Sequence, residues 1–161
     1  MLNTNPIKGL SYVIGDKSEP LSEQTIPELL ARTASAFPDR EAVVFPTQDI
    51  RWTWREFTRL VDRLAGGLIS LGVRKGERVG IWSPNRIEWI MTQFATARIG
   101  AILVCINPAY RPYELEFALN KVGCKVLVTA RSFKSSDYIS MLQGLAPELS
   151  ATAPGDLRAA K

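Results

Sequence analysis

Three apolar segments of this chain are each followed by a short polar loop whose side chains are suited to bind a ligand. The segments are residues 78–82, 101–106 and 125–130, and the loops are residues 83–85, 107–110 and 129–132. In an open parallel sheet, ligands collect outside the carboxyl ends of the strands, so Asn107 and Arg131 are candidate binding residues. Each also has a structural explanation, because Asn107 precedes Pro108 in a turn and Arg131 is equally suited to be a solvated cation. The residues alone leave both interpretations open.

Acid–base and metal chemistry is restricted because the chain contains no histidine. This excludes Ser-His-Asp and Cys-His mechanisms within the chain and removes the commonest zinc ligand. The acidic residues that a magnesium site would need fall on predicted helices rather than at strand ends: Asp62, Glu88, Glu114 and Glu116. We therefore predict no catalytic residue and no metal site in this chain.

A phosphate-binding loop is not found in the sequence either. Gly9 and Gly15 are separated by five residues and followed by Asp16, so the spacing of a nucleotide-binding P-loop is not met. No G-x-G-x-x-G motif follows a predicted strand. Backbone amides cannot hold a triphosphate without such a loop, so we do not expect this chain alone to hydrolyse a nucleotide. A flavin-binding or phosphoacceptor doubly wound domain is disfavoured for the same reason.

The composition is typical of one soluble domain. The chain has 161 residues, of which 46% are hydrophobic, enough to build a single core. Lys and Arg outnumber Asp and Glu by 20 to 16 without forming a run, so nucleic-acid binding is not expected. No apolar stretch approaches the ~18 residues of a membrane span, and the N-terminus has no leader pattern. We expect a cytoplasmic protein in which Cys105 and Cys124 are buried free thiols.

The first half of the chain predicts a helix followed by a β-hairpin. Thr25 and Glu28 form a capping box at the start of a helix of about a dozen residues. Its apolar face consists of Ile26, Leu29, Leu30, Ala34 and Phe37. Residues 42–45 and 50–54 then flank the four-residue turn 46–49, which indicates a hairpin.

A second helix follows the hairpin. Thr53 and Glu56 form its capping box, and Gly72 is placed to take the left-handed conformation just past its end. Gly66 and Gly67 lie inside this helix, where each costs about 1 kcal/mol relative to alanine. We expect that the close approach of another backbone compensates for this cost.

From residue 78 onward, the three apolar segments alternate with capped helices. Asn85 and Glu88 are predicted to cap the first intervening helix, and Pro112 opens the second. Such alternation is typical of a parallel sheet that is covered by helices on both faces. The predicted fold class is α/β, with a parallel βαβαβ layer, flanking helices and the β-hairpin.

The sequence predicts three regions. Residues 1–24 form an irregular N-terminal arm, residues 25–149 form the α/β domain, and residues 150–161 form a weakly ordered tail. A last amphipathic helix is predicted from Phe133 to about Ala146.

Two long segments of the chain resemble core motifs of a known enzyme family. Residues 52–85, WTWREFTRLVDRLAGGLISLGVRKGERVGIWSPN, resemble the first core motif of the adenylate-forming (AMP-binding) enzymes. Residues 95–128, ATARIGAILVCINPAYRPYELEFALNKVGCKVLV, resemble the second core motif and the segment beyond it. In this order they are similar to fatty acyl-CoA synthetases. GLSYVIG (9–15) and SFKSSDYISML (132–142) are most similar to the medium-chain acyl-CoA ligase branch.

The resemblance implies an enzyme that activates a fatty acid with ATP and Mg²⁺ to an acyl-adenylate, then transfers the acyl group to coenzyme A (CoA). In that family the phosphate loop, the metal-binding acid and the mobile domain with its lysine all lie further along the chain. We therefore predict the N-terminal piece of a larger synthetase domain, catalytically silent alone and without a tightly bound cofactor. By analogy, the loops from Asn107 to Arg111 and from Arg131 to Lys134 approach the CoA nucleotide, and Arg131 and Lys134 offer cations.

Two further expectations follow from this interpretation. A piece of a larger domain leaves an apolar face or a sheet edge uncovered, which predicts self-association. The alternative from another class is a short stand-alone α/β module that binds an acyl group or CoA, or a protein partner, without catalysis. The reading frame beyond Lys161 distinguishes the two hypotheses.

Overall fold

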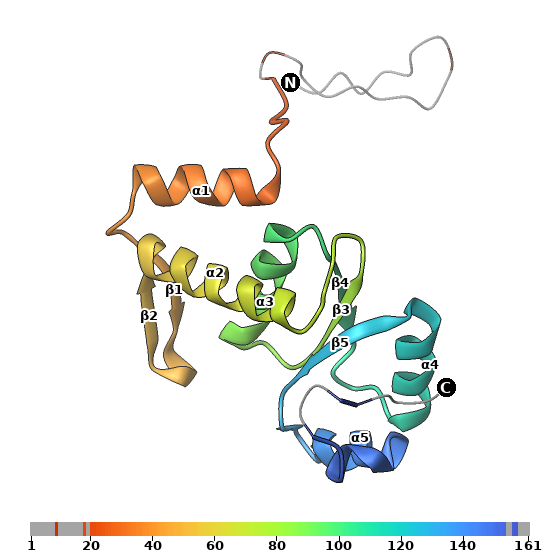
Figure 1. Ribbon diagram of the computed structural model, residues 1–161. Coiled ribbons are helices and arrows are strands. Elements are labelled where there is room, and N and C mark those ends of the chain that lie inside the picture. Colours follow the sequence, from red (N-terminus) through yellow and green to blue (C-terminus); the bar gives the residue numbers. More distant parts are fainter. Residues whose placement is uncertain (1–8, 10–17, 19, 154–155, 158–161) are drawn as a thin grey trace.

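The computed structural model describes residues 9, 18, 20–153 and 156–157, and this part of the chain contains five α-helices and seven strands (Figure 1). In chain order they are α1 (Ile26–Ala36), β1 (Glu41–Phe45), β2 (Ile50–Thr53), α2 (Trp54–Ser70), β3 (Arg78–Trp82), α3 (Ile87–Arg98), β4 (Ile102–Ile106), α4 (Pro112–Val122), β5 (Cys124–Thr129), β6 (Ser132–Phe133), β7 (Ser136–Asp137) and α5 (Tyr138–Leu145). Short 3-10 turns lie at Pro46–Gln48 and Pro147–Ser150. Most of the predicted arm 1–24 and half of the predicted tail 150–161 lie outside the described residues, and the region boundaries stay predictions.

The centre of the fold is a three-stranded parallel sheet in the order β4-β3-β5. On one face of the sheet, Val79 and Val126 pack in a core with α2 and α3. On the other face, Trp82 and Ile106 pack in a second core with α4 and α5. Figure 1 shows these helix pairs on opposite sides of the sheet. The predicted α/β class and βαβαβ layer are therefore confirmed.

The predicted helix starts and hairpin of the first half are also confirmed. Thr25 and Glu28 form the capping box of α1, and Thr53 and Glu56 form that of α2. In each box the threonine hydroxyl accepts a hydrogen bond from the glutamate backbone N–H, and the carboxylate accepts one from the threonine N–H. Strands β1 and β2 pair antiparallel across the predicted turn. These features depend on residues three or four positions apart, which is why local sequence predicts them.

Two predicted helix starts are wrong. Asn85 does not cap α3, because the helix begins at Ile87 and its N-cap residue, Arg86, makes no capping hydrogen bond through its side chain. The helix predicted from Phe133 begins instead at Tyr138. Lys134 has a positive φ of 52°, and this left-handed residue reverses the chain between β6 and β7 before the helix can start.

Three burial predictions are also corrected by the structure. Cys105 is exposed rather than buried, since β4 lies at the edge of the sheet and has a neighbouring strand on one side only. Gly66 and Gly67 face open space: a Cβ added at either position would have no neighbouring atom within 4 Å, so no backbone approaches them. On α1, only Leu30 of the predicted apolar face is fully buried, because this helix contacts the fold through one side.

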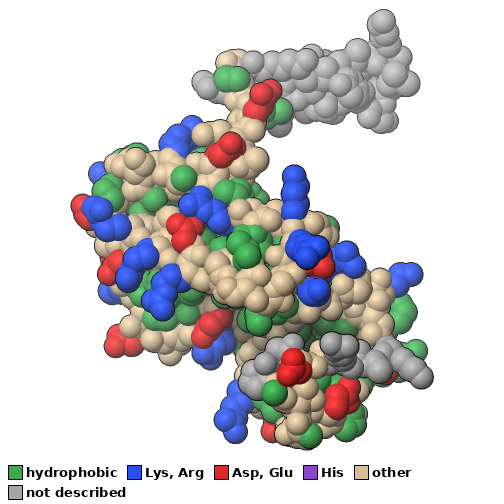
Figure 2. Space-filling model, in the orientation of Figure 1, with side chains coloured by type: hydrophobic (Ala, Val, Ile, Leu, Met, Phe, Trp, Pro, Cys, Tyr) green, Lys and Arg blue, Asp and Glu red, His purple; other side chains and the backbone are tan. Residues whose placement is uncertain are grey.

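Charged side chains of both signs are mixed on the face of the molecule that contains α1 and α2 (Figure 2). Figure 2 shows lysine, arginine and acidic side chains interspersed on the face that contains α1 and α2. None of the helices in the described residues combines the length and apolar content that a membrane span needs. This face of the described residues (Figure 2) therefore carries no large field of one sign.

Candidate functional site

The carboxyl ends of the three parallel strands meet at one edge of the sheet. Trp82 of β3 is in register with Ile106 of β4 and with Thr129 of β5. The backbone carbonyl of Trp82 accepts hydrogen bonds from the Thr129 hydroxyl at 3.1 Å and from the Ala130 N–H at 3.2 Å. The loops that follow β4 and β5 therefore leave the same end of the sheet, on either side of β3, as the sequence predicts.

Two stacked aromatic rings lie beneath these loops. The rings of Trp82 and Tyr138 have centroids 3.6 Å apart and an interplanar angle of 14°, and both side chains are fully buried. Trp82 Nε1 donates to the backbone carbonyl of Asn107 at 3.0 Å. The Tyr138 hydroxyl donates to the carbonyl of Pro108 at 2.5 Å. Burial raises the pKa of the Tyr138 phenol, so this group remains a donor across the physiological pH range.

Asn107 has a structural role in its own loop. Its Oδ1 atom accepts a hydrogen bond from the Ala109 N–H at 2.9 Å, and its backbone carbonyl accepts one from the Tyr110 N–H at 3.1 Å. This is the turn chemistry expected of an Asn-Pro sequence. The residue is nevertheless exposed at the edge of the sheet. Asn107 is therefore better placed to shape the loop than to bind a ligand through its amide oxygen.

Arg131 and Lys134 lie on the β6–β7 hairpin, beyond the end of β5, and both are exposed. The Arg131 carbonyl accepts the Tyr138 N–H at 3.1 Å, which closes the base of this hairpin. Lys134 Nζ lies 5.3 Å from the centre of the Phe133 ring. The pKa of nearby Asp137 is lowered chiefly by the hydrogen bond that it accepts from the Ser140 N–H, and the charge of Arg131 adds to this effect.

A direct contact joins the hairpin to the loop after β4. Arg111 Nη1 donates to the Ser136 hydroxyl at 3.1 Å. Together with the Tyr138 bond to Pro108, this contact places the Asn107 loop and the hairpin that bears Arg131 and Lys134 in one structural unit. The three predicted binding residues are thus brought to the same edge of the sheet. The sequence placed Arg111 in the predicted loop 107–111, but it gave no signal for the role of Tyr138, which fell inside the helix predicted from Phe133.

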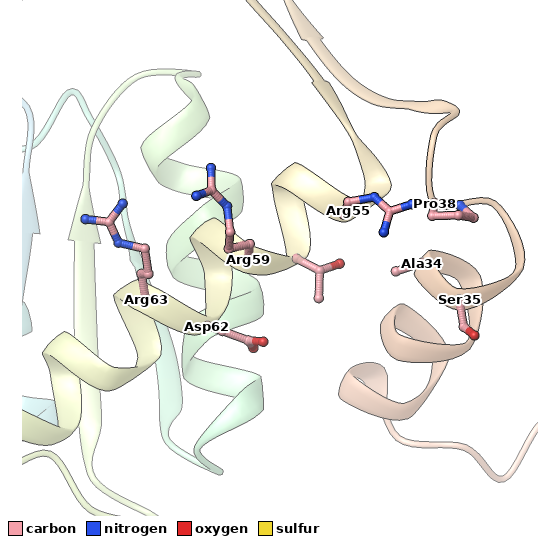
Figure 3. Close-up of a pocket in the computed structure, with 8 residues that line it drawn as sticks. Ala34, Ser35, Pro38, Arg55, Arg59, Asp62 and Arg63 are labelled. Carbon is pink, nitrogen blue, oxygen red and sulfur yellow. The ribbon is translucent and has the colours of Figure 1, made fainter.

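A hollow lies between α1 and α2, away from the carboxyl ends of the parallel strands. It has a volume of about 770 Å³ and is lined by Ala34, Ser35, Pro38, Arg55, Thr58, Arg59, Asp62 and Arg63. Figure 3 shows Arg59 and Arg63 extending from the same side of α2, while Asp62 points to another side. Arg55 is paired with Asp39 at 3.0 Å. The hollow is wide open and its arginines are exposed, as expected for a solvated helix face.

The described residues do not fit a bound Mg²⁺ or the triphosphate of ATP. No group of three or more His, Cys, Asp or Glu side chains comes together in this part of the chain. No segment of the sequence contains the G-x-x-x-x-G-K motif of a nucleotide-binding P-loop or a G-x-G-x-x-G motif. Arg131 and Lys134 supply two cations at an exposed edge of the sheet, where an anionic group can be bound.

The fold and the sequence both match known proteins. Residues 30–156 match the AMP-binding enzyme family. The chain belongs to this family. It is 46% identical over 156 residues to the mitochondrial medium-chain acyl-CoA ligase ACSF2 of Rattus norvegicus, a match that covers 97% of this chain and 25% of the relative. It is 41% identical over 138 residues to the putative acyl-CoA synthetase YngI of Bacillus subtilis (strain 168), a match that covers 86% of this chain and 25% of that relative.

Solved structures show the same architecture. The fatty acyl-CoA synthetase of Mycobacterium tuberculosis matches with a TM-score of 0.69 and 29% identity over 75% of this chain and 23% of that chain. A putative long-chain-fatty-acid CoA ligase of Rhodopseudomonas palustris matches with a TM-score of 0.68 and 34% identity. This match covers 78% of this chain and 30% of that chain. The predicted family resemblance is therefore confirmed. The chain spans about a quarter of the length of the curated relatives it matches.

One prediction is contradicted by these relatives. Seven of the matched curated proteins are named mitochondrial acyl-CoA ligases, from rat, zebrafish, mouse and other animals, at 44 to 46% identity. The expectation of a cytoplasmic location, which was drawn from composition, is therefore wrong. The physical reason is that composition reports how a folded domain behaves in water, whereas a cellular address is read from separate targeting segments.

Proposed function

We propose that this chain forms the N-terminal part of a fatty acyl-CoA synthetase that acts on medium-chain fatty acids. Such an enzyme joins the fatty acid carboxylate to AMP, using ATP and Mg²⁺, and then transfers the acyl group to CoA. The observation that carries the proposal is 46% identity to a medium-chain acyl-CoA ligase over 97% of this chain. The match in fold to fatty acyl-CoA synthetases supports it.

The described residues supply a scaffold to this reaction rather than its reacting groups. They offer no histidine, no cluster of metal-ligating side chains and no phosphate-binding loop. We therefore expect the chain alone to form no acyl-adenylate. In a complete synthetase, ATP and Mg²⁺ would be held by residues outside this chain.

The part of the reaction to which this chain contributes directly is the binding of CoA. Arg131 and Lys134 are exposed cations on one short hairpin, next to the Asn107 loop. Cationic side chains bind phosphate oxygens through charge-assisted hydrogen bonds, which are roughly twice as strong as neutral ones. We assign the phosphates of the CoA nucleotide to these two side chains, and a role in shaping the adjacent loop to Asn107.

A chimeric enzyme tests the proposed function. Residues 25–149 replace the matched segment of the Bacillus subtilis acyl-CoA synthetase, and pyrophosphate release and acyl-CoA formation are measured with octanoate, ATP, Mg²⁺ and CoA. We expect both activities in the chimera and neither in the 161-residue chain alone. A soluble, folded chimera that forms no acyl-adenylate would contradict the proposal.

Reversing the charges of Arg131 and Lys134 tests the CoA assignment independently of the proposed acyl-adenylate formation. In the chimera, Arg131→Glu with Lys134→Glu should raise the KM for CoA by roughly tenfold or more while leaving octanoate-dependent pyrophosphate release unchanged. Arg32→Glu, an exposed position on α1, is the matched control. An unchanged KM for CoA in the double variant would contradict the assignment of the CoA phosphates to these two side chains.

The alternative, a stand-alone module that binds an acyl group or CoA without catalysis, predicts a different result. Isothermal titration of the 161-residue chain with CoA and with octanoyl-CoA would then show tight binding. We expect weak binding at most, because the hairpin offers two cations on an open surface.

A further inference from the structure

The two stacked rings beneath the sheet edge each donate a hydrogen bond to the same loop. Trp82 Nε1 binds the carbonyl of Asn107 and the Tyr138 hydroxyl binds the carbonyl of Pro108, so two successive backbone carbonyls are held by one ring pair. The rings are in van der Waals contact, with centroids 3.6 Å apart. A movement of one ring therefore moves both carbonyls together.

The same pair is connected to the hairpin that bears the cations. Tyr138 is the first residue of α5, and its backbone N–H donates to the Arg131 carbonyl at 3.1 Å. Trp82 lies at the end of β3, the central strand, which is the best-buried strand of the sheet. The ring pair therefore joins three elements that are far apart in the sequence: the central strand, the loop after β4 and the β6–β7 hairpin.

Neither ring can touch a ligand at the edge of the sheet. Both side chains have no exposed surface, and their polar atoms are already satisfied by the Asn107 and Pro108 carbonyls. Any effect of these residues on binding must pass through the loops that they hold. Tyr138→Phe removes one of these hydrogen bonds without changing the ring that stacks on Trp82.

We propose that Trp82 and Tyr138 are positioning residues that hold the Asn107-Pro108 loop in fixed register with Arg131 and Lys134, so that CoA meets a preformed site. This inference rests on the proposed function, in which the two cations bind the CoA phosphates. Rigid placement lowers the conformational entropy that the loops lose when the ligand binds. Without the two hydrogen bonds, the loop and the hairpin are still joined by the Arg111–Ser136 contact, but their relative position is less fixed and CoA affinity falls.

The experiment compares Tyr138→Phe and Trp82→Phe with the wild-type 161-residue chain. Tyr113→Phe is the matched control, because Tyr113 is 81% exposed on α4 and lies outside the ring pair. Hydrogen exchange of the Ala109 and Tyr110 amides reports the state of the loop, since both are bonded to Asn107. Amide chemical shifts of residues 131–134 during titration with CoA report binding. The urea midpoint reports global stability.

We expect Tyr138→Phe to speed exchange of the two loop amides by about fivefold to tenfold and to weaken CoA binding by a factor of about three or more. Exchange of the central β3 amides and the Tyr113→Phe control should stay at the wild-type level. Trp82→Phe should act in the same direction, with a larger loss of global stability because it also shrinks a buried ring.

The outcomes separate this inference from the proposed function. Equal CoA affinity in the wild-type chain and in Tyr138→Phe would overturn the positioning role while leaving the CoA site in place. Unchanged exchange of the Ala109 and Tyr110 amides would also overturn it, because the loop would then be held by its own turn. No CoA-dependent shift at residues 131–134 in the wild-type chain would remove the CoA assignment itself, and the positioning inference with it.

Discussion

The side chain of Gln48 caps a helix that begins 39 residues further along the chain. Gln48 Oε1 accepts a hydrogen bond from the backbone N–H of Ile87 at 2.9 Å, at the first residue of α3. Its Nε2 group donates to the carboxylate of Glu88 at 3.1 Å. Because Arg86, the N-cap residue, makes no capping bond through its side chain, the hairpin turn supplies the missing acceptor. The β-hairpin is thereby fixed to the parallel-sheet part of the fold.

Substitution of Gln48 is expected to destabilise the protein more than its position in a surface turn suggests. Gln48→Ala leaves the Ile87 N–H at a helix start without its partner, which should lower the free energy of unfolding by about 1 kcal/mol. Thr47→Ala in the same turn is the matched control. Urea denaturation followed by circular dichroism measures both, and equal effects of the two substitutions would refute the cap.

Gly66→Ala in α2 is expected to stabilise the fold. A Cβ at this position meets no atom within 4 Å, so the substitution adds no clash. Alanine in a helix interior is favoured over glycine by about 0.5–1 kcal/mol, because less backbone entropy is lost on folding. Thermal unfolding should show a higher midpoint, and the same change at Gly67 should act similarly. A lower midpoint would mean that another backbone does approach α2.

Gly80→Ala at the centre of the sheet should act in the opposite direction. A Cβ on this residue would lie 2.9 Å from Cys124 Sγ and 3.0 Å from Leu127 Cδ1, so the sheet must shift to accept it. Overpacking of this kind costs about 1–3 kcal/mol. Urea denaturation of both variants measures whether Gly80→Ala lowers and Gly66→Ala raises the free energy of unfolding. A neutral Gly80→Ala would show that the side chains around it repack freely.

The stability of the protein is expected to fall in acid in part through the Thr25–Glu28 and Thr53–Glu56 capping boxes. The backbone N–H of Thr25 lowers the pKa of Glu28 below its ordinary value of 4.5, and the backbone N–H of Thr53 does the same for Glu56. A carboxyl with a lowered folded-state pKa stabilises the fold above about 4.5, and the contribution disappears as the pH falls through the lowered value. Unfolding midpoints measured from about pH 7 to about pH 2 should show this loss.

Neutral variants test the assignment of this acid transition. Glu28→Gln combined with Glu56→Gln should flatten the fall in stability below about pH 4.5. Glu116→Gln on α4 is the control, since Glu116 belongs to no capping box. If the double variant loses stability in acid as steeply as the wild type, other groups control the transition.

Self-association of the isolated chain is expected through the outer face of α4. Tyr113 is 81% exposed and Phe117 is 63% exposed, one helical turn apart, and Ile102 on the edge strand β4 is 52% exposed. Sedimentation velocity over a range of concentrations should show a concentration-dependent dimer or larger species. Phe117→Glu should shift the chain toward monomer, while Gln143→Glu on the exposed side of α5 should not. A monomer at all concentrations would contradict this prediction.

Much of the fold was predictable because it depends on residues close together in the chain. Thr25 with Glu28 and Thr53 with Glu56 form hydrogen bonds within one helical turn, so their spacing alone predicts both helix starts. The parallel sheet follows from apolar strands that alternate with helices, because only that arrangement covers both faces. The family motifs in residues 52–85 and 95–128 are likewise continuous in sequence and match the assigned family.

The sequence by itself thus determined the α/β class, most helix starts and the edge of the sheet at which Asn107, Arg131 and Lys134 lie. The tertiary structure alone determined the Gln48 cap of α3, the exposure of Cys105 and the stack of Trp82 on Tyr138. The physical reason is distance along the chain. A hydrogen bond or ring contact between residues tens of positions apart leaves no period or local spacing to recognise, and it exists only once the sheet has brought its partners together.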